Sequence, residues 1–251
     1  MKSPSLVLDG SIATIQLNNP ESANRLSVAD LEILQEHIVA VNQNEAILAL
    51  VVRSTGKYFC SGFDITSLDE SAKEKSLLFE VVVNALEDCR PITIAALQGG
   101  VYGGATDLAL ACDFRIGTEA TEMLMPAAKL GIHFYQRGLE RYVSRLGINA
   151  AKRLLLSAEK IQAEEMVRIG FLTQLVKDVD LEKTVALLIE QLMTMAPLPL
   201  LGMKKHLNRI ARGSLDVDEL NHDINVAQNS EDLQEGRHAW AEKRVPLFKG
   251  R

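Results

Sequence analysis

Short apolar runs separated by turn residues mark the first part of the chain as β-structure. The runs 6–8 and 12–17 flank Asp9-Gly10, a dipeptide that favours a tight turn between two antiparallel strands. We therefore expect a β-hairpin within residues 6–17.

A helical period replaces this pattern after residue 27. Ser27 and Asp30 have the spacing of a capping box, in which each side chain bonds the backbone amide of the other residue. Apolar residues follow at helical spacing, namely Leu31, Leu34, Ile38 and Val41. The sequence therefore predicts a capped helix here.

The alternation of strand and helix patterns then continues to about residue 120. Further strands are expected at 46–52, 92–97 and 114–116, and helices at 76–88 and 104–112. Strands that alternate with helices imply right-handed crossovers and a largely parallel sheet that helices cover. The predicted fold class is therefore α/β.

Beyond residue 140 the pattern becomes mainly helical. The expected helices are 150–157, 163–169, 181–195, 216–228 and 232–244, and Pro197 and Pro199 interrupt the series. No segment has the composition of a flexible linker. We expect one α/β core, residues 1–195, and a helical C-terminal region, residues 196–251.

Composition narrows the function classes. Of 251 residues, 47% are hydrophobic and 24% charged, which is ordinary for a globular protein, and the formal charge of −6 argues against non-specific nucleic-acid binding. Cys60, Cys89 and Cys112 have no metal-ligand spacing, so we expect no metal site and a reducing cytoplasm. We expect neither a signal peptide nor a membrane span, because no apolar window reaches about 18 residues.

Two glycine-containing turns carry the candidate chemistry. One is Cys60-Ser61-Gly62-Phe63-Asp64, and the other is the segment 99–107, which begins Gly-Gly-Val-Tyr-Gly-Gly. Glycine lets the backbone approach a ligand closely and leaves an N–H group free to point at it. Two such N–H groups that face one another would stabilise negative charge on a carbonyl oxygen.

Asp107 lies three residues beyond Gly104, so its side chain shares a helix face with the Gly104 amide. A carboxylate beside an oxyanion donor suits proton transfer next to a carbonyl group. The alternative is that Asp107 only complements the positive end of the helix, and that the first glycine turn is an ordinary tight turn.

These segments resemble the crotonase (enoyl-CoA hydratase/isomerase) superfamily. The resemblance rests on Phe-Cys-Ser-Gly-Phe-Asp-Ile at 59–65 paired with Gly-Gly-Ala-Thr-Asp-Leu-Ala-Leu-Ala-Cys-Asp at 103–113. Weaker matches lie at 17–20, 163–172 and 235–244, in the same order as in the family. The resemblance covers essentially the whole chain.

The resemblance implies a fold and a site. The fold would be a spiral of ββα turns with a helical C-terminal region, assembled as a homotrimer or as a hexamer (a dimer of trimers). The substrate would be an acyl thioester of coenzyme A (CoA), with no tightly bound cofactor. The backbone N–H groups of Phe63 and Gly104 would bind the thioester oxygen. Nearby contacts to the substrate would come from Ser61, Asp64, Ile65 and Gly103, whereas Trp240 and Lys243 would reach the nucleotide end of CoA bound to a neighbouring subunit.

The chain departs from the hydratase pattern at the catalytic positions. Hydratases of this family use two glutamates, and the corresponding residues here are Asp107 and Ala127. The loop 130–138 instead offers His133, Tyr135 and Arg137. Histidine and tyrosine suit acid–base work and arginine suits a substrate carboxylate, although local packing would explain all three equally well.

The leading hypothesis is therefore an enzyme that forms a thioester enolate with Asp107 as a single carboxylate acid/base. One base that removes and returns a proton gives double-bond isomerisation, and water addition stays open if His133 or Tyr135 replaces the missing glutamate. Decarboxylation of a malonyl-type thioester, or hydrolysis of a thioester or carbon–carbon bond, is the alternative within the family. A CoA-binding paralogue without turnover is the alternative from another class.

Overall fold

The computed structural model describes residues 3–64 and 72–251, which form two compact units, Met1–Val185 and Ala186–Arg251. The predicted boundary after residue 195 stays a prediction. The division of the structure falls within helix α7, Leu181–Met193.

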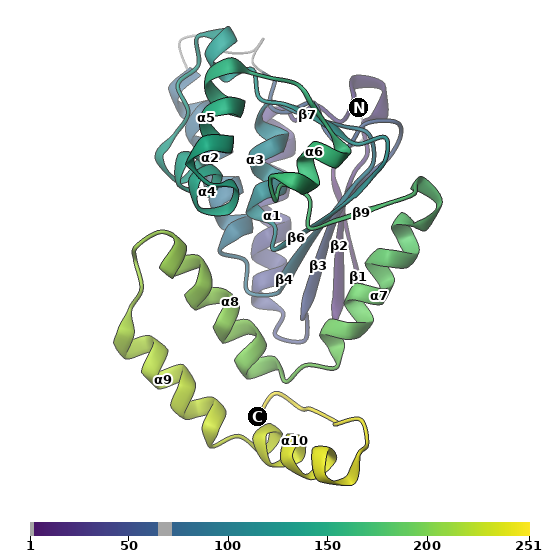
Figure 1. The fold of residues 1–251 in the computed structure, drawn as a ribbon, viewed down its shortest axis with the longest axis vertical. Coiled ribbons are helices and arrows are strands. Elements are labelled where there is room, and N and C mark those ends of the chain that lie inside the picture. Colours follow the sequence, from purple (N-terminus) through teal and green to yellow (C-terminus); the bar gives the residue numbers. More distant parts are fainter. Residues whose placement is uncertain (1–2, 65–71) are drawn as a thin grey trace. The chain divides into compact units, whose positions relative to one another are not determined.

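The larger unit contains a mainly parallel sheet. In the described chain, six strands have the order β1-β2-β3-β4-β6-β9 (Figure 1). Their bounds are β1 Ser5–Asp9, β2 Ile12–Leu17, β3 Ala49–Ser54, β4 Ile92–Leu97, β6 Phe114–Thr118 and β9 Gln174–Val176. The first two strands form the predicted antiparallel hairpin, and every later pair is parallel. The predictions of a hairpin and of a largely parallel sheet are confirmed.

A second, smaller sheet runs through the turns between the main elements. Its described strands are β5 Gly100–Tyr102, β7 Glu122–Leu124 and β8 Ile161–Gln162, in the order β5-β7-β8. Each of β4 and β6 is thus followed by a short strand of this sheet, and β5 leads directly into a helix. This succession is the expected ββα turn.

Helix α2 packs against both α1 and α3 beside the main sheet (Figure 1). The helices of this unit are α1 Val28–Gln43, α2 Ala72–Glu87, α3 Gly104–Ala111, α4 Gln136–Leu146, α5 Ile148–Ser157 and α6 Ala163–Arg168. Helix α1 begins with the predicted capping box, in which the Asp30 amide donates to Ser27 Oγ and the Ser27 amide donates to Asp30 Oδ2 at 2.9 Å.

The hydrophobic core lies where these helices meet the sheet. Leu31, Leu34, Ile38 and Val41 are buried as the helical spacing predicted. Strand β4 is buried along its full length and lies between the parallel strands β3 and β6. The core therefore fixes the positions of the loops that follow the parallel strands.

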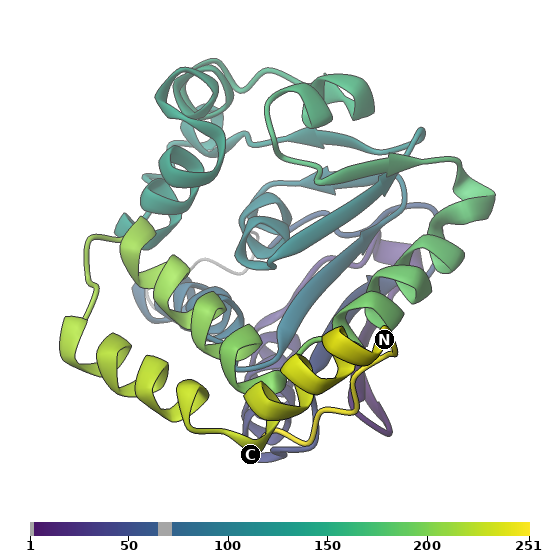
Figure 2. The same ribbon diagram turned by 60° about the horizontal axis from the view of Figure 1, so that its bottom comes forward.

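The smaller unit is helical. It contains α8 Pro197–Ala211, α9 Val217–Gln228 and α10 Glu231–Glu242. Helices α8 and α9 lie side by side (Figures 1 and 2), joined by ion pairs such as Lys205 with Glu219 at 2.7 Å. Pro197 occupies the first turn of α8, where its missing N–H costs no hydrogen bond, so the same prolines that end the preceding run also begin a helix.

Within the part of the chain that the structure describes, no single helix has the length and apolarity to cross a membrane; by length and composition, the segments Asp178–Met193 and Pro197–Ala211 pass that test only as a bent pair.

Candidate active site

The two glycine turns lie against each other in the larger unit. Cys60 pairs with Val101 in a parallel bridge, which brings the first turn alongside strand β5. A methyl group placed on Gly62 would lie 2.8 Å from the Tyr102 carbonyl oxygen and 2.9 Å from the Gly104 nitrogen. Gly62 has φ +92° and Gly103 has φ +55°, conformations that glycine adopts at little cost.

The amides of Phe63 and Gly104 are unengaged in this arrangement. Residues on either side of Phe63 bond Leu26, since the Leu26 amide donates to the Gly62 oxygen and the Asp64 amide donates to the Leu26 oxygen, each at 2.9 Å. Within residues 3–64 and 72–251, neither the Phe63 nor the Gly104 amide donates a hydrogen bond. Gly104 is also the first residue of α3, where a helix carries partial positive charge.

The Cys60 side chain stabilises the first glycine turn through hydrogen bonds of its Sγ atom. Its Sγ accepts a hydrogen bond from the Gly62 amide at 3.3 Å and donates to the Asn24 carbonyl oxygen at 3.0 Å. Burial raises the pKa of the Cys60 thiol to about 12, and the thiol therefore stays protonated at neutral pH. Cys60 has the contacts of a structural residue.

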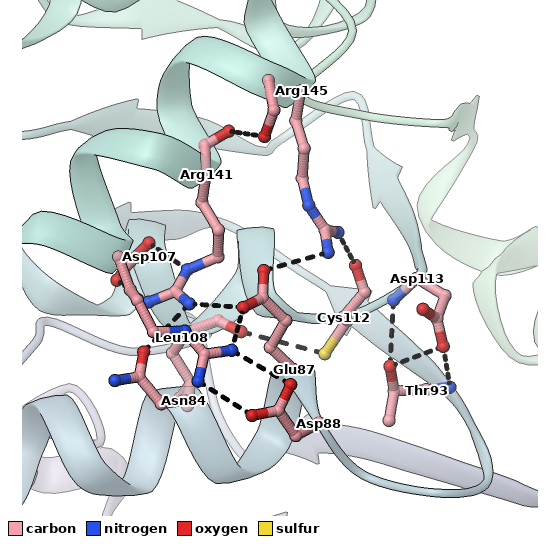
Figure 3. A network of polar contacts seen from close by, with 12 residues as sticks. Asn84, Glu87, Asp88, Thr93, Asp107, Leu108, Cys112, Asp113, Arg141 and Arg145 are labelled. Atoms are coloured by element: carbon pink, nitrogen blue, oxygen red, sulfur yellow. Dashed lines mark hydrogen bonds and ion pairs between the residues drawn. The ribbon is translucent and has the colours of Figure 1, made fainter. Parts of the chain in front are cut away.

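Asp107 lies in the first turn of α3, as expected, and its residue surface is 0% exposed. The guanidinium of Arg141 holds its carboxylate with two hydrogen bonds, from Nε to Oδ1 at 2.9 Å and from Nη2 to Oδ2 at 2.8 Å (Figure 3). The Tyr135 hydroxyl also donates to Oδ2. The contact with Arg141, which lies in helix α4, was not predicted from the sequence.

Arg141 continues into a buried network of charges (Figure 3). Its Nη1 bonds Glu87 at 3.0 Å and Asn84 at 3.1 Å. Burial alone would raise the pKa of Glu87, but Arg141 and the neighbouring guanidinium groups of Arg137 and Arg145 outweigh it and lower that pKa. The Asp107 carboxylate thus belongs to an extended, charge-balanced cluster between α2, α3 and α4.

The three candidates of the loop after Ala127 have different surroundings. Tyr135 joins Asp107, and burial, followed by the charge of Asp107, raises its pKa, so the hydroxyl stays neutral. Arg137 pairs with Glu87 and with Asp88, the latter at 2.8 Å. His133 is exposed, and its Nδ1 lies 2.8 Å from the Phe134 carbonyl oxygen.

Ala127, the position where a second glutamate was expected for a hydratase, is buried at the start of the short 3-10 helix Ala127–Leu130. Its methyl group offers no proton-transferring atom. Across residues 3–64 and 72–251, no group of three or more His, Cys, Asp or Glu side chains is arranged to hold a metal ion. Of the two positions where a catalytic carboxylate was expected, Asp107 carries one and Ala127 does not.

The expected substrate-contacting residues are divided between the two units. Ser61 Oγ donates to the Ser22 carbonyl oxygen at 3.3 Å, Asp64 pairs with Arg25 at 3.4 Å, and Gly103 caps α3. Ile65 lies outside the described residues.

The two residues expected at the nucleotide end of CoA lie in the smaller unit. Trp240 is 87% exposed and lines an open, largely apolar hollow with Leu233 and Phe248, and Lys243 caps the end of α10. Both side chains are therefore accessible from outside this unit.

Comparison with known proteins finds a matching family and several similar proteins. The family model described as enoyl-CoA hydratase/isomerase matches residues 8–251. A probable enoyl-CoA hydratase of Bacillus subtilis is 31% identical, with 100% of both chains covered. A short-chain-enoyl-CoA hydratase of Clostridium acetobutylicum is 27% identical over 97% of this chain and 96% of that protein. The crystal structure of an enoyl-CoA hydratase from Bacillus anthracis, 26% identical, superposes with a TM-score of 0.90 and 100% coverage of both chains.

Proposed function

This chain belongs to the enoyl-CoA hydratase/isomerase family, and on that premise we propose that it converts an acyl-CoA thioester through an enolate bound in a two-amide oxyanion hole. The observation that carries the proposal is the contact of the two glycine turns, which leaves the Phe63 and Gly104 amides without partners beside Asp107. CoA enters as part of the substrate.

The two amides would act on the thioester oxygen. When a proton leaves the α-carbon, negative charge moves to that oxygen, and fixed N–H donors stabilise it without reorganisation. The positive end of helix α3 adds to this effect at Gly104. Enolate formation is the step that this geometry favours.

Asp107 would be the single carboxylate that accepts and returns the proton. Its contacts with Arg141 and Tyr135 occupy Oδ2 twice and Oδ1 once, which leaves one acceptor position on Oδ1. Because Ala127 provides no second carboxylate, we propose double-bond isomerisation as the leading reaction. Hydration would need a second proton-transferring group, such as Tyr135 or His133.

Assembly would complete the CoA site. We propose that Trp240 and Lys243 reach the nucleotide end of CoA bound to a neighbouring subunit of a trimer or hexamer. Their exposure supports this role, since an exposed indole can stack on a base and an ammonium group can pair with a phosphate.

The test is proton exchange. The protein is incubated in heavy water with a panel of saturated, 2-enoyl, 3-enoyl and malonyl-type CoA thioesters, and mass spectrometry follows deuterium at the α-carbon. We expect exchange and movement of the double bond in the wild type, and loss of both in Asp107→Asn. Asp113→Asn is the matched control, because Asp113 Oδ2 accepts a hydrogen bond from the Thr93 amide at 2.7 Å, outside the proposed site.

The other outcomes separate the alternatives. Full exchange in Asp107→Asn would contradict the single-carboxylate proposal. Release of carbon dioxide from a malonyl-type thioester, unchanged in Asp107→Asn, would indicate a decarboxylase. Binding of the thioesters without any conversion would indicate a non-catalytic CoA-binding protein.

A further inference from the structure

Asp107 and Tyr135 are hydrogen-bonded to each other but differ in solvent exposure. Asp107 is 0% exposed, whereas Tyr135 is only partly buried and places its hydroxyl against the Asp107 carboxylate. Arg141 and Tyr135 together engage three of the four acceptor positions of that carboxylate. Of the two hydrogen-bonded residues, Tyr135 is therefore the more accessible from outside the fold.

Phe79 connects this tyrosine with the two-amide hole. A methyl group on Gly104 would lie 2.6 Å from the tip of the Phe79 ring, so this ring covers the start of α3. The same ring lies 6.0 Å from the ring of Phe63 and 6.4 Å from the ring of Tyr135, measured between centroids. The hole and the tyrosine thus border one aromatic side chain.

Arg141 ties the tyrosine and the carboxylate together. Its Nη2 donates to Asp107 Oδ2 at 2.8 Å and also to the Tyr135 oxygen at 3.3 Å. The ring of Tyr135 additionally lies 5.9 Å from the guanidinium carbon. One cation therefore fixes the distance and direction of the hydrogen bond that joins the two acid/base candidates.

From this geometry we propose that Tyr135 carries the proton between the substrate and Asp107, and that Arg141 is the positioning residue that holds the two in line. The inference rests on the enolate chemistry proposed above. It adds that Asp107 acts on the α-carbon through a tyrosine and does not touch it.

The relay balances without another reactant. The α-carbon–hydrogen bond breaks, its proton binds to the Tyr135 oxygen, and its electron pair passes into the enolate at the two-amide hole. In the same step the Tyr135 hydroxyl proton moves to Asp107 Oδ2. Return of the proton along the same path to the α- or γ-carbon restores the carboxylate and completes exchange or isomerisation. Tyr135 is neutral before and after each step, in keeping with its raised pKa.

The test compares Tyr135, the residue that precedes helix α4, with Tyr142, which lies within it. Tyr135→Phe removes the hydroxyl at Asp107, whereas Tyr142→Phe removes a buried hydroxyl that lies 2.5 Å from Thr106 Oγ1 on the same helix as Asp107. We expect Tyr135→Phe to slow α-deuterium exchange by about 10²–10⁴-fold, the usual range for a general acid–base group, and Tyr142→Phe to leave the exchange rate within a few-fold of the wild type. Thermal melts and CoA-thioester binding check that both variants fold.

A second measurement excludes a purely structural role. Site-specific replacement of Tyr135 by 3-fluorotyrosine keeps the hydroxyl and its size but makes the phenol more acidic. The exchange rate should change for a proton carrier and should stay constant for a tyrosine that only packs.

The outcomes distinguish this relay from the function it rests on. Loss of exchange in both Tyr135→Phe and Asp107→Asn supports the relay. Exchange that persists in folded Tyr135→Phe but is lost in Asp107→Asn overturns the relay and leaves Asp107 as a direct base. Exchange that persists in Asp107→Asn, or is absent from the wild type, overturns the proposed function itself.

Discussion

Arg141 binds Asp107 through two parallel hydrogen bonds, Nε to Oδ1 at 2.9 Å and Nη2 to Oδ2 at 2.8 Å, with both side chains almost fully buried. This fork-to-fork contact sets the orientation of the carboxylate beside the proposed oxyanion hole. It also commits the protein to keeping both charges, because a buried ion that loses its partner is costly.

Removal of Arg141 should therefore destabilise the fold strongly. We expect Arg141→Ala to lower the free energy of unfolding by about 3–5 kcal/mol, since Asp107 and Glu87 both lose a buried cation. Arg137→Ala should cost about 1 kcal/mol or less, because the Arg137 side chain is 24% exposed and water replaces part of its contact. Urea denaturation of the two variants measures the difference, and equal losses would contradict the idea that burial decides it.

Local sequence signals predicted the elements that depend on neighbours in the chain. The hairpin at Asp9-Gly10 and the capping box at Ser27 are such cases, since a few adjacent residues determine them. The glycine turns were also recognisable, because only glycine allows Gly62 to approach the Gly104 nitrogen so closely.

The partners of Asp107 were missed because the start of helix α4 carries little helical signal, although Leu139, Tyr142 and Leu146 recur further along it at helical spacing. Its first turn has no side-chain cap, and it contains Gly138, a residue that disfavours helices. The glycine is there because a methyl group at position 138 would lie 2.3 Å from the Phe134 ring. The Arg141–Asp107 contact joins residues 34 apart and depends on tertiary packing that no local pattern encodes, whereas Gly138 packs on Phe134, only four residues away.

Replacement of two helical glycines by alanine should therefore change stability in opposite directions. Gly138→Ala should destabilise the protein by about 1–3 kcal/mol, because Phe134 must move despite the gain in helix propensity. Phe134 lies 4.9 Å from Tyr135 between ring centroids, so α-deuterium exchange should also slow. Gly202→Ala in α8 meets no atom closer than 3.7 Å and should stabilise the fold by about 0.5–1 kcal/mol. Thermal and urea unfolding measure the change in stability of both variants. Stabilisation by Gly138→Ala would contradict the prediction.

Cys60 should give the protein a specific weakness in alkali. Its pKa is raised from 9.0 to about 12 by burial, so the folded state keeps a proton that the unfolded state loses above pH 9. The stabilisation is complete below pH 9 and is lost as pH rises toward 12, by about 1.4 kcal/mol per pH unit. Urea midpoints from pH 8 to 10.5 should fall more steeply in the wild type than in Cys60→Ala, and parallel curves would argue against the shift.

The proposed oxyanion hole should depend on the absence of a side chain at Gly62. A methyl group there would press on the Gly104 nitrogen at 2.9 Å and on the Tyr102 carbonyl oxygen at 2.8 Å, which pushes the two amides apart. We expect Gly62→Ala to lower kcat by about 10²–10³-fold, the usual effect of losing one oxyanion donor. Gly10→Ala is the matched control, because Gly10 also has a positive φ, +55°, but a methyl group there meets no atom within 4 Å. Both variants should lose about 1–2 kcal/mol of stability from the strained backbone, and only Gly62→Ala should lose turnover. Equal turnover in the two variants would place the enolate oxygen elsewhere.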